Sequence, residues 1–174
     1  MKPLWTSAQV EYVTQGQSSS DWIANGVSID SRTIEHGDLF VALHGPNYDG
    51  HDFVSDALSK GAAAAVVDKT REGSTLKVGD TMKALQSLGL AARKRTEATI
   101  IAVTGSVGKT GSKDAICFAL SRQACTFANK GSLNNHWGVP LSLSRMPPKT
   151  TYGIFELGMN HPGEIYSLSK MVRP

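Results

Sequence analysis

One stretch of the sequence restricts the fold more than any other, because a strand, a glycine loop and a helix follow one another in it without a gap. The apolar segment Thr99–Val103 is followed directly by a loop with two glycines, and a helix is predicted from Lys109 onwards. A continuous apolar strand is typical of a parallel sheet covered on both faces. A glycine loop between such a strand and a helix is typical of a phosphate-binding loop. We therefore expect an α/β fold with a ligand at the end of this strand.

The residue types of the loop suit a polyphosphate. Gly105 and Gly108 allow a backbone that turns several N–H groups toward one centre, where phosphate oxygens lie at the start of a helix. Lys109 supplies a positive charge to the outer phosphates, and Thr110 supplies a hydroxyl for Mg²⁺. The predicted ATP-binding residues are Thr104, Gly105, Ser106, Val107, Gly108, Lys109 and Thr110.

Other polar side chains are predicted at the same edge of the sheet. Glu156 lies at the end of another apolar strand, where its carboxylate can hold Mg²⁺ directly or through water. Asn134 and Asn135 follow the preceding strand, and Asn160 follows Glu156 in a glycine-containing loop. Amide side chains at this edge are suited to orienting a substrate or a nucleotide.

Each of these candidates also has a plainer interpretation. Val103 stands where the full phosphate-loop pattern has glycine, so the segment could be a glycine turn with a surface lysine. Glu156 could be an exposed residue at a strand end, and asparagine-rich loops often serve only as turns. His51, His136 and His161 lack partners at metal-ligand spacing, so no zinc site is expected.

Hydrophobic patterning divides the chain into two α/β halves joined by a helix. The predicted strands are 27–30, 39–43, 62–67, 99–103, 124–128 and 152–157. The predicted helices are 53–58, one that starts at Asp80 or Thr81, 109–122, one that opens at Pro140, and one through 165–171. We expect a small N-terminal α/β domain over 1–79, a connecting helix over 80–98 and a parallel-sheet domain over 99–174.

Composition argues against several other classes of protein. No run approaches the ~18 apolar residues of a membrane span, and the first residues lack the apolar region of a signal peptide, so we expect a cytoplasmic protein without a span. The 18 Lys and Arg exceed the 15 Asp and Glu only slightly. The densest basic cluster, Arg93-Lys94-Arg95, is predicted to be a solvated helix end rather than a nucleic-acid site. Cys117 and Cys125 lack CxxC spacing, so no disulfide framework is expected.

Several segments, taken in order, resemble the Mur ligases of peptidoglycan synthesis. They are Asp30-Ser31-Arg32, 37–42, 49–53, the phosphate loop 104–110, 134–141 and 156–165. Together they extend over nearly the whole chain, and the ordered set is far more specific than any one of them.

The resemblance implies an N-terminal domain that holds a UDP-sugar and a central ATPase domain with a P-loop. It implies an ATP-dependent acid–amino-acid ligase with ATP and Mg²⁺ as cofactors, and UDP-N-acetylmuramoyl-tripeptide and D-alanyl-D-alanine as substrates. The substrate carboxylate is activated as an acyl phosphate, and an amine then displaces phosphate to form the amide. We expect the protein to be a monomer.

The resemblance also implies roles for individual residues. The nucleotide-sugar would contact Ser31, Arg32, Gly45, Pro46, Asn47 and Tyr48. The residues implied near the bound substrates are Asn134, Asn135 and Asn160. Thr110 and Glu156 would serve Mg²⁺, and Lys109 and Glu156 are the predicted catalytic residues.

The sequence departs from the family pattern in three respects. Gly111 stands where many family members have Thr or Ser, which weakens the start of the helix. The family's carbamylated lysine is not assigned, because Lys170 is too close to Glu156. The family's C-terminal domain is absent from these residues. We therefore expect an N-terminal fragment that is inactive alone.

Two other functions remain open. One is a free-standing P-loop kinase or NTPase that uses only the second half, which would leave the motifs around Ser31 and Asp49 unexplained. The other is a non-catalytic module that binds a nucleotide-sugar and ATP. The folate polyglutamate ligases share the P-loop, but they usually lack a preceding UDP-binding domain, so residues 1–79 argue against them.

Overall fold

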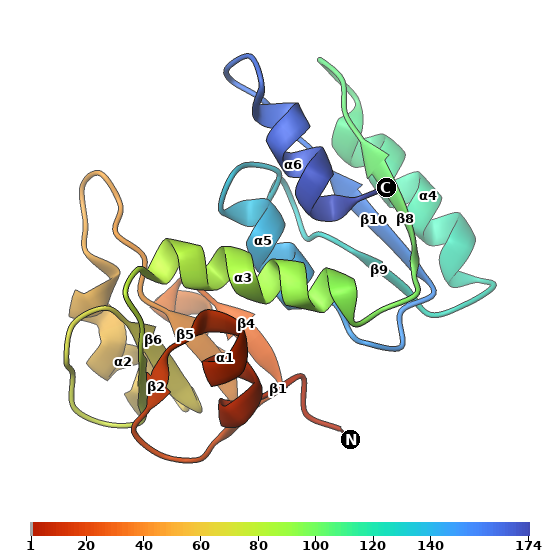
Figure 1. Ribbon diagram of the computed structural model, residues 1–174. Coiled ribbons are helices and arrows are strands. Elements are labelled where there is room, and N and C mark those ends of the chain that lie inside the picture. The colour runs from red at the N-terminus through yellow and green to blue at the C-terminus, as the bar shows by residue number, and fades with distance from the viewer. Residues whose placement is uncertain (1) are drawn as a thin grey trace. The chain divides into compact units, whose positions relative to one another are not determined.

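The chain folds into two compact α/β units, as Figure 1 shows for the computed structural model, which describes residues 2–174. The first unit extends to Leu88 and the second comprises Gly89–Pro174. Helix α3 (Thr81–Lys94) contains the boundary between them. Each unit has its own sheet with parallel strands, so the predicted α/β class is confirmed.

The N-terminal unit is built on a five-stranded sheet in the order β2-β7-β6-β5-β4. Its strands are β2 (Gln17–Ser18), β4 (Gly26–Ser28), β5 (Asp38–Val41), β6 (Ala64–Val67) and β7 (Thr75–Lys77). All neighbours pair in parallel except β2 and β7, which are antiparallel. A separate antiparallel pair is formed by β1 (Trp5–Thr6) and β3 (Ile23–Ala24). The helices are α1 (Ser7–Thr14), α2 (Val54–Ser59) and the 3₁₀ turns Ser31–Thr33 and Gly50–Phe53.

The core of this unit lies between the sheet and α2. Alternate residues of β5 and β6 point to one face of a sheet. On that face they form a buried cluster with α2, composed of Phe40, Ala42, Val54, Ala57, Ala65 and Val67. The small side chains on β6 allow α2 to lie close to the strands.

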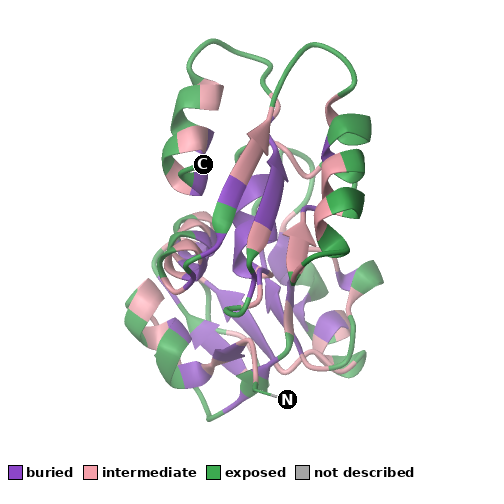
Figure 2. Cartoon of the chain, turned by 90° about the vertical axis from the view of Figure 1, so that its right-hand side faces the viewer, coloured by how far each residue is buried: buried purple, intermediate pink, exposed green. Residues whose placement is uncertain are grey.

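The C-terminal unit has a three-stranded parallel sheet in the order β8-β10-β9. Its strands are β8 (Thr99–Val103), β9 (Thr126–Ala128) and β10 (Tyr152–Glu156). Its helices are α4 (Lys109–Ser121), α5 (Gly138–Ser144) and α6 (Glu164–Val172). The buried core cluster contains Ala98, Ile100, Val139, Leu143, Met146, Phe155, Leu157, Leu168 and Val172. Figure 2 shows β10 as a largely buried strand, whereas α4 is mostly exposed.

The predicted strands and helices are confirmed, with differences at their ends. Strand β4 ends at Ser28, because the Asp30 carboxylate accepts a hydrogen bond from the Arg32 N–H and caps the 3₁₀ turn. Helix α5 begins at Gly138, two residues before Pro140. The sequence pattern gave no sign of α1 or β7, which are short. No helix in the described part of the chain is long and apolar enough to cross a bilayer.

The predicted solvated helix end at residues 93–95 is wrong for its two arginines. Arg93 donates through Nε to the Val172 carbonyl oxygen (2.8 Å) and through Nη2 to that of Arg173 (3.0 Å). Arg95 donates through Nη2 to the Met146 carbonyl oxygen (3.2 Å), and burial lowers its pKa to about 10. The guanidinium groups thus donate to carbonyl groups at or just after the C-terminal ends of α5 and α6, a role that charge spacing alone does not reveal.

Gly50 gives a test of the packing at the end of β5. A Cβ there would lie 2.6 Å from the Leu43 carbonyl oxygen and 2.7 Å from the Leu43 nitrogen, so the backbone would have to shift. We expect Gly50→Ala to lower the free energy of unfolding by about 1–3 kcal/mol. The matched control is Gly79→Ala, because an added Cβ meets no atom within 4 Å there. Urea unfolding followed by tryptophan fluorescence measures both, and equal midpoints would contradict the packing argument.

Candidate functional site

The register of the C-terminal sheet brings the phosphate loop and Glu156 to one edge. Strand β8 pairs in parallel with β10, and Val103 lies opposite Glu156 in that pair. The loop 104–108 therefore leaves the sheet at the level where the glutamate side chain begins. Ligands of open α/β sheets bind at this carboxyl edge of the strands.

The loop itself adopts backbone that favours glycine. Gly105 has φ +146° and Gly108 has φ +75°, and Gly108 is the residue that precedes α4. Lys109 folds back so that its Nζ donates to the Gly105 carbonyl oxygen at 2.8 Å. The loop leads directly into the 13-residue helix α4, so the positive N-terminal end of the helix lies at the loop. These features fit the predicted phosphate site.

Glu156 connects this loop to the asparagine loop that follows β9. Its Oε2 accepts a hydrogen bond from the Thr110 hydroxyl at 2.7 Å, and its Oε1 accepts one from the Asn134 amide at 2.7 Å. Glu156 is only 2% exposed, which excludes the plainer interpretation of a solvated strand-end residue. Buried carboxylates are costly unless they are paired, and here each oxygen has a partner.

The other two asparagines take part in local turns. The Asn135 side-chain oxygen accepts from the Gly138 N–H at 2.8 Å, which satisfies a donor at the start of α5. The Asn160 N–H donates to Glu164 at 2.7 Å, and with the His161 N–H it holds the pKa of Glu164 below its ordinary value. The structure therefore brings Lys109, Thr110, Asn134 and Glu156 to one edge. It gives no side-chain contact of Asn160 with them.

The donor set at Thr110 and Glu156 fits Mg²⁺. Both side chains supply oxygen atoms, which hard cations prefer, and the Thr110 Oγ1 and Glu156 Oε2 atoms are 2.7 Å apart. Adjacent ligands around an octahedral Mg²⁺ with bonds of 2.0–2.1 Å are about 3 Å apart. The two oxygens therefore need little movement to occupy adjacent positions.

The predicted substrate residues of the N-terminal unit lie at the carboxyl edge of its sheet. Ser31 follows β4, and the turn 45–48 follows the neighbouring parallel strand β5. The Ser31 carbonyl oxygen accepts from the Lys60 ammonium at 3.2 Å. The turn 45–48 is closed by the Gly45 N–H, which donates to the Tyr48 carbonyl oxygen at 2.9 Å. The turn residues Pro46, Asn47 and Tyr48 are exposed.

Arg32 is held by a bidentate ion pair. Its Nε and Nη2 donate to the two Asp30 carboxylate oxygens at 2.9 and 2.6 Å. These hydrogen bonds hold the pKa of Asp30 below its ordinary value. The Arg32 side chain is nevertheless 84% exposed, so the guanidinium remains open to an anionic ligand.

A histidine network next to the turn 45–48 was not predicted from the sequence. The His51 ring is buried, and its Nδ1 lies 2.6 Å from an Asp49 carboxylate oxygen. Its Nε2 lies 3.1 Å from both the Asp68 backbone nitrogen and an Asp68 carboxylate oxygen. His44 stacks on His51, with ring centroids 4.8 Å apart, and contacts Asp68 through Nε2 at 2.8 Å. The segment 49–51 was the signal for this network, because its aspartate and histidine are two residues apart.

The ligand atoms of His44, His51 and Asp68 lie within 4.8 Å of one another, which is close enough to consider a metal ion. Both ring nitrogens of His51 already have protein partners, however, and a metal would have to displace the Asp68 N–H. We therefore interpret the cluster as a hydrogen-bond network that fixes the turn after β5.

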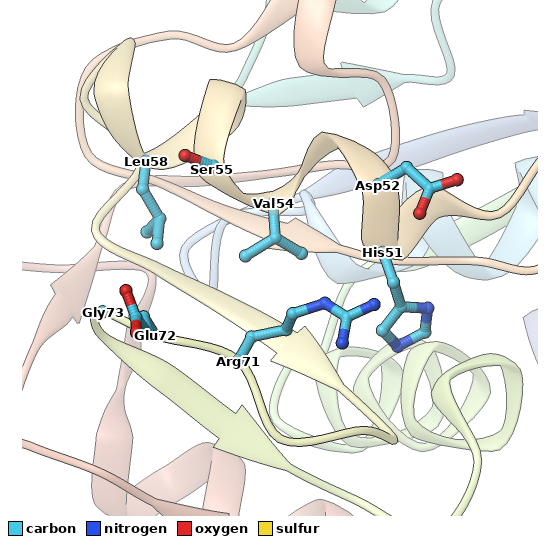
Figure 3. Close-up of a pocket in the computed structure, with 8 residues that line it drawn as sticks. All are labelled: His51, Asp52, Val54, Ser55, Leu58, Arg71, Glu72 and Gly73. Atoms are coloured by element: carbon cyan, nitrogen blue, oxygen red, sulfur yellow. The ribbon is translucent and has the colours of Figure 1, made fainter.

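The N-terminal unit also has an open cavity of about 560 Å³ beside α2. Figure 3 shows Arg71 extending across it toward His51. The lining residues are His51, Asp52, Val54, Ser55, Leu58, Arg71, Glu72 and Gly73. None of the predicted substrate residues lines this cavity, so it is separate from the predicted nucleotide-sugar contacts.

The comparisons with known proteins agree on one family over both units. The family described as "Mur ligase family, catalytic domain" matches residues 24–115, and the "Mur ligase middle domain" matches residues 103–174. The UDP-N-acetylmuramoyl-tripeptide–D-alanyl-D-alanine ligase of Rickettsia prowazekii is 39% identical over 175 residues. That match includes 98% of this chain and 39% of the relative.

Two solved structures of ligases are also similar to this chain. The UDP-N-acetylmuramoylalanyl-D-glutamyl-2,6-diaminopimelate–D-alanyl-D-alanyl ligase of Acinetobacter baumannii has a TM-score of 0.86 at 37% identity, covering 100% of this chain and 40% of that one. The MurF ligase of Thermotoga maritima, in complex with ADP, has a TM-score of 0.68 at 30% identity, covering 84% and 35%. The chain thus spans about two fifths of the length of these proteins.

Asp49 provides a pH test of the histidine network. The backbone N–H and ring of His51, together with Lys69, hold the pKa of Asp49 well below its ordinary value. Its contribution to stability is therefore fully present above the unfolded pKa of about 3.9 and is lost as the pH falls through the folded pKa. We expect Asp49→Asn to lower the urea midpoint most near pH 7, with a smaller difference from wild type below about pH 3. The exposed neighbour Asp52, changed to Asn, is the control, and a pH-independent difference for Asp49→Asn would refute this account.

Proposed function

This chain belongs to the Mur ligase family, and from that premise we propose that it binds ATP and a UDP-sugar peptide for an ATP-dependent amide ligation in peptidoglycan synthesis. The observation that carries the proposal is the contact of Thr110 with the buried carboxylate of Glu156, directly after the phosphate loop. The relatives match both units of the chain, which argues against an independent NTPase that uses only the second unit.

The C-terminal unit is proposed to bind ATP. The residues of the loop 104–108, with the positive end of α4, hold the phosphates, and Lys109 exchanges its contact with Gly105 for a phosphate oxygen. The Thermotoga relative in complex with ADP supports a nucleotide here. Thr110 and Glu156 are proposed to hold Mg²⁺, which when bound neutralises phosphate charge.

The N-terminal unit is proposed to bind the UDP part of the other substrate. Ser31 and the turn 45–48 lie at one edge of its sheet, and the exposed guanidinium of Arg32 can meet a diphosphate. The names of the relatives point to UDP-N-acetylmuramoyl-tripeptide as this substrate and to D-alanyl-D-alanine as the second. Asn134, held on Glu156, is suited to orient the tripeptide end near the ATP.

The proposed chemistry proceeds in two steps. An oxygen of the tripeptide carboxylate attacks the γ-phosphorus of ATP, and ADP leaves as the acyl phosphate forms. The amine of D-alanyl-D-alanine then attacks the acyl carbon, and phosphate leaves with the bond electrons while the amine loses a proton. The chain's part is to position the phosphates and to neutralise their charge, so a carboxylate can approach without a covalent enzyme intermediate.

Two substitutions separate the two proposed binding sites. We expect Lys109→Ala to weaken binding of a non-hydrolysable ATP analogue at least tenfold and to leave binding of the UDP-sugar peptide unchanged, because only the phosphate loop loses a charge. Ser31→Ala should weaken binding of the UDP-sugar peptide and leave binding of the ATP analogue unchanged. Isothermal titration of each variant with each ligand measures this, and a variant that weakens both ligands equally would indicate general unfolding instead.

We propose further that these 174 residues do not complete the ligation by themselves. The chain matches 39% of the Rickettsia relative, and the carbamylated lysine expected of the family is not assigned within it. The expected outcome is nucleotide binding without detectable release of phosphate when both peptide substrates are added. A malachite-green phosphate assay with the purified chain measures this, and amide product that depends on all three substrates would overturn the proposal.

A further inference from the structure

Lys113 is a buried lysine that the site described so far does not use. It lies four residues after Lys109 on α4, so both side chains leave the same face of the helix. The Lys113 side chain is 2% exposed. A buried ammonium group is costly unless its donors are satisfied, so the position of its partners indicates what it does.

The partners of Lys113 lie in the segment that leads from β9 to Asn134. Its Nζ donates to the Asn129 carbonyl oxygen at 2.8 Å and to the Gly131 carbonyl oxygen at 3.2 Å, and it lies 3.2 Å from an Asp114 carboxylate oxygen. An ammonium group has three hydrogens, and here it has three oxygen partners. Two of these partners are main-chain groups of one turn, so Lys113 fixes the path of the chain there.

Asn129 transmits this constraint to the carboxylate site. It is 2% exposed, and its Oδ1 accepts from the Glu156 N–H at 2.9 Å. Its Nδ2 donates to the Leu133 carbonyl oxygen at 3.0 Å. Leu133 precedes Asn134, whose amide contacts the Glu156 carboxylate. The Asn129 side chain thus holds both the residue that carries the carboxylate and the turn that carries its amide partner.

From these contacts we propose that Lys113 is a positioning residue, which clamps the turn 129–131 onto α4 and so fixes Asn134 and Glu156 for the ligands at Thr110. The connection runs through one helix, since Thr110 and Lys113 are both on α4. Lys113 thereby connects α4, which carries the Thr110 hydroxyl, to the turn 129–131, which supports the Glu156 carboxylate. The nucleotide and Mg²⁺ part of this inference rests on the proposed function, whereas the clamp itself does not.

Hydrogen exchange tests the clamp without any ligand. The reporter amides are Glu156, bonded to Asn129, and Gly158, which donates to the Asn134 carbonyl oxygen at 2.8 Å. The internal control is the amide of Leu157, which donates to Val103 in the sheet at 2.8 Å. In Lys113→Met we expect the two reporter amides to exchange at least about tenfold faster and the Leu157 amide to change less than twofold.

Three further variants make this experiment decisive. Lys113→Arg keeps the charge and donors and is expected to restore most of the protection, while Lys170→Met removes an exposed lysine of the same unit and should change nothing. Asn129→Ala should expose the same two amides and is measured in the same way if Lys113→Met does not fold. Unchanged reporter amides, or equal acceleration of Leu157, would overturn the clamp.

A second readout connects the clamp to the proposed metal site. The affinity for a non-hydrolysable ATP analogue is measured by calorimetry with and without Mg²⁺. We expect Lys113→Met to reduce the gain in affinity that Mg²⁺ provides by about tenfold, as removal of groups that orient metal ligands does, and to leave the Mg²⁺-free affinity within twofold. If Mg²⁺ increases the affinity of Lys113→Met for the analogue as much as it does for wild type, the proposed connection from Lys113 to Glu156 is contradicted. If the wild-type chain binds no nucleotide, the proposed function fails, and the exchange experiment still decides the role of Lys113.

Discussion

The parallel pairing of β8 with β10 is the constraint on which the rest of the C-terminal unit depends. Because Val103 and Glu156 occupy the same level of the sheet, the loop after one strand meets the carboxylate at the end of the other. The Glu156 carboxylate accepts hydrogen bonds from two further segments, one from the Thr110 hydroxyl and one from the Asn134 amide. A shift of one residue in this register would point the Glu156 side chain to the other face of the sheet and would dismantle the arrangement.

The N-terminal unit follows the same principle with different chemistry. Its parallel strands β4 and β5 also end side by side, and their carboxyl ends carry Ser31, Arg32 and the turn 45–48. The turn is fixed by the buried His51 ring, whose two nitrogens contact Asp49 and Asp68. Each unit therefore presents irregular backbone at one sheet edge and keeps it rigid with polar groups that are buried beneath it.

The sequence predicted those parts of the fold and site that depend on local patterns. Thr99–Val103, the two glycines of the loop and the residues Lys109 and Thr110 are adjacent in the chain, so their geometry could be inferred from strand, turn and helix rules. Contacts between distant segments could not. Lys113 has the ordinary sequence pattern of a surface lysine in a helix, and only the fold shows that its side chain is buried and bonded to Asn129. The solvated helix end predicted at Arg93 and Arg95 is wrong for the same reason, because the carbonyl groups of Arg173 and Met146 that they contact lie more than 50 residues away in the sequence.

The resting contact of Lys109 with Gly105 has a consequence for how tightly any polyanion can be retained. The ammonium group already donates one of its three hydrogens to a carbonyl of its own loop, so a phosphate oxygen at the proposed site would replace an existing hydrogen-bond partner. Loss of the bond to Gly105 offsets part of the favourable interaction with the phosphate, and that bond can form again when the anion leaves. Such an internal acceptor favours rapid release of a bound polyanion over long residence.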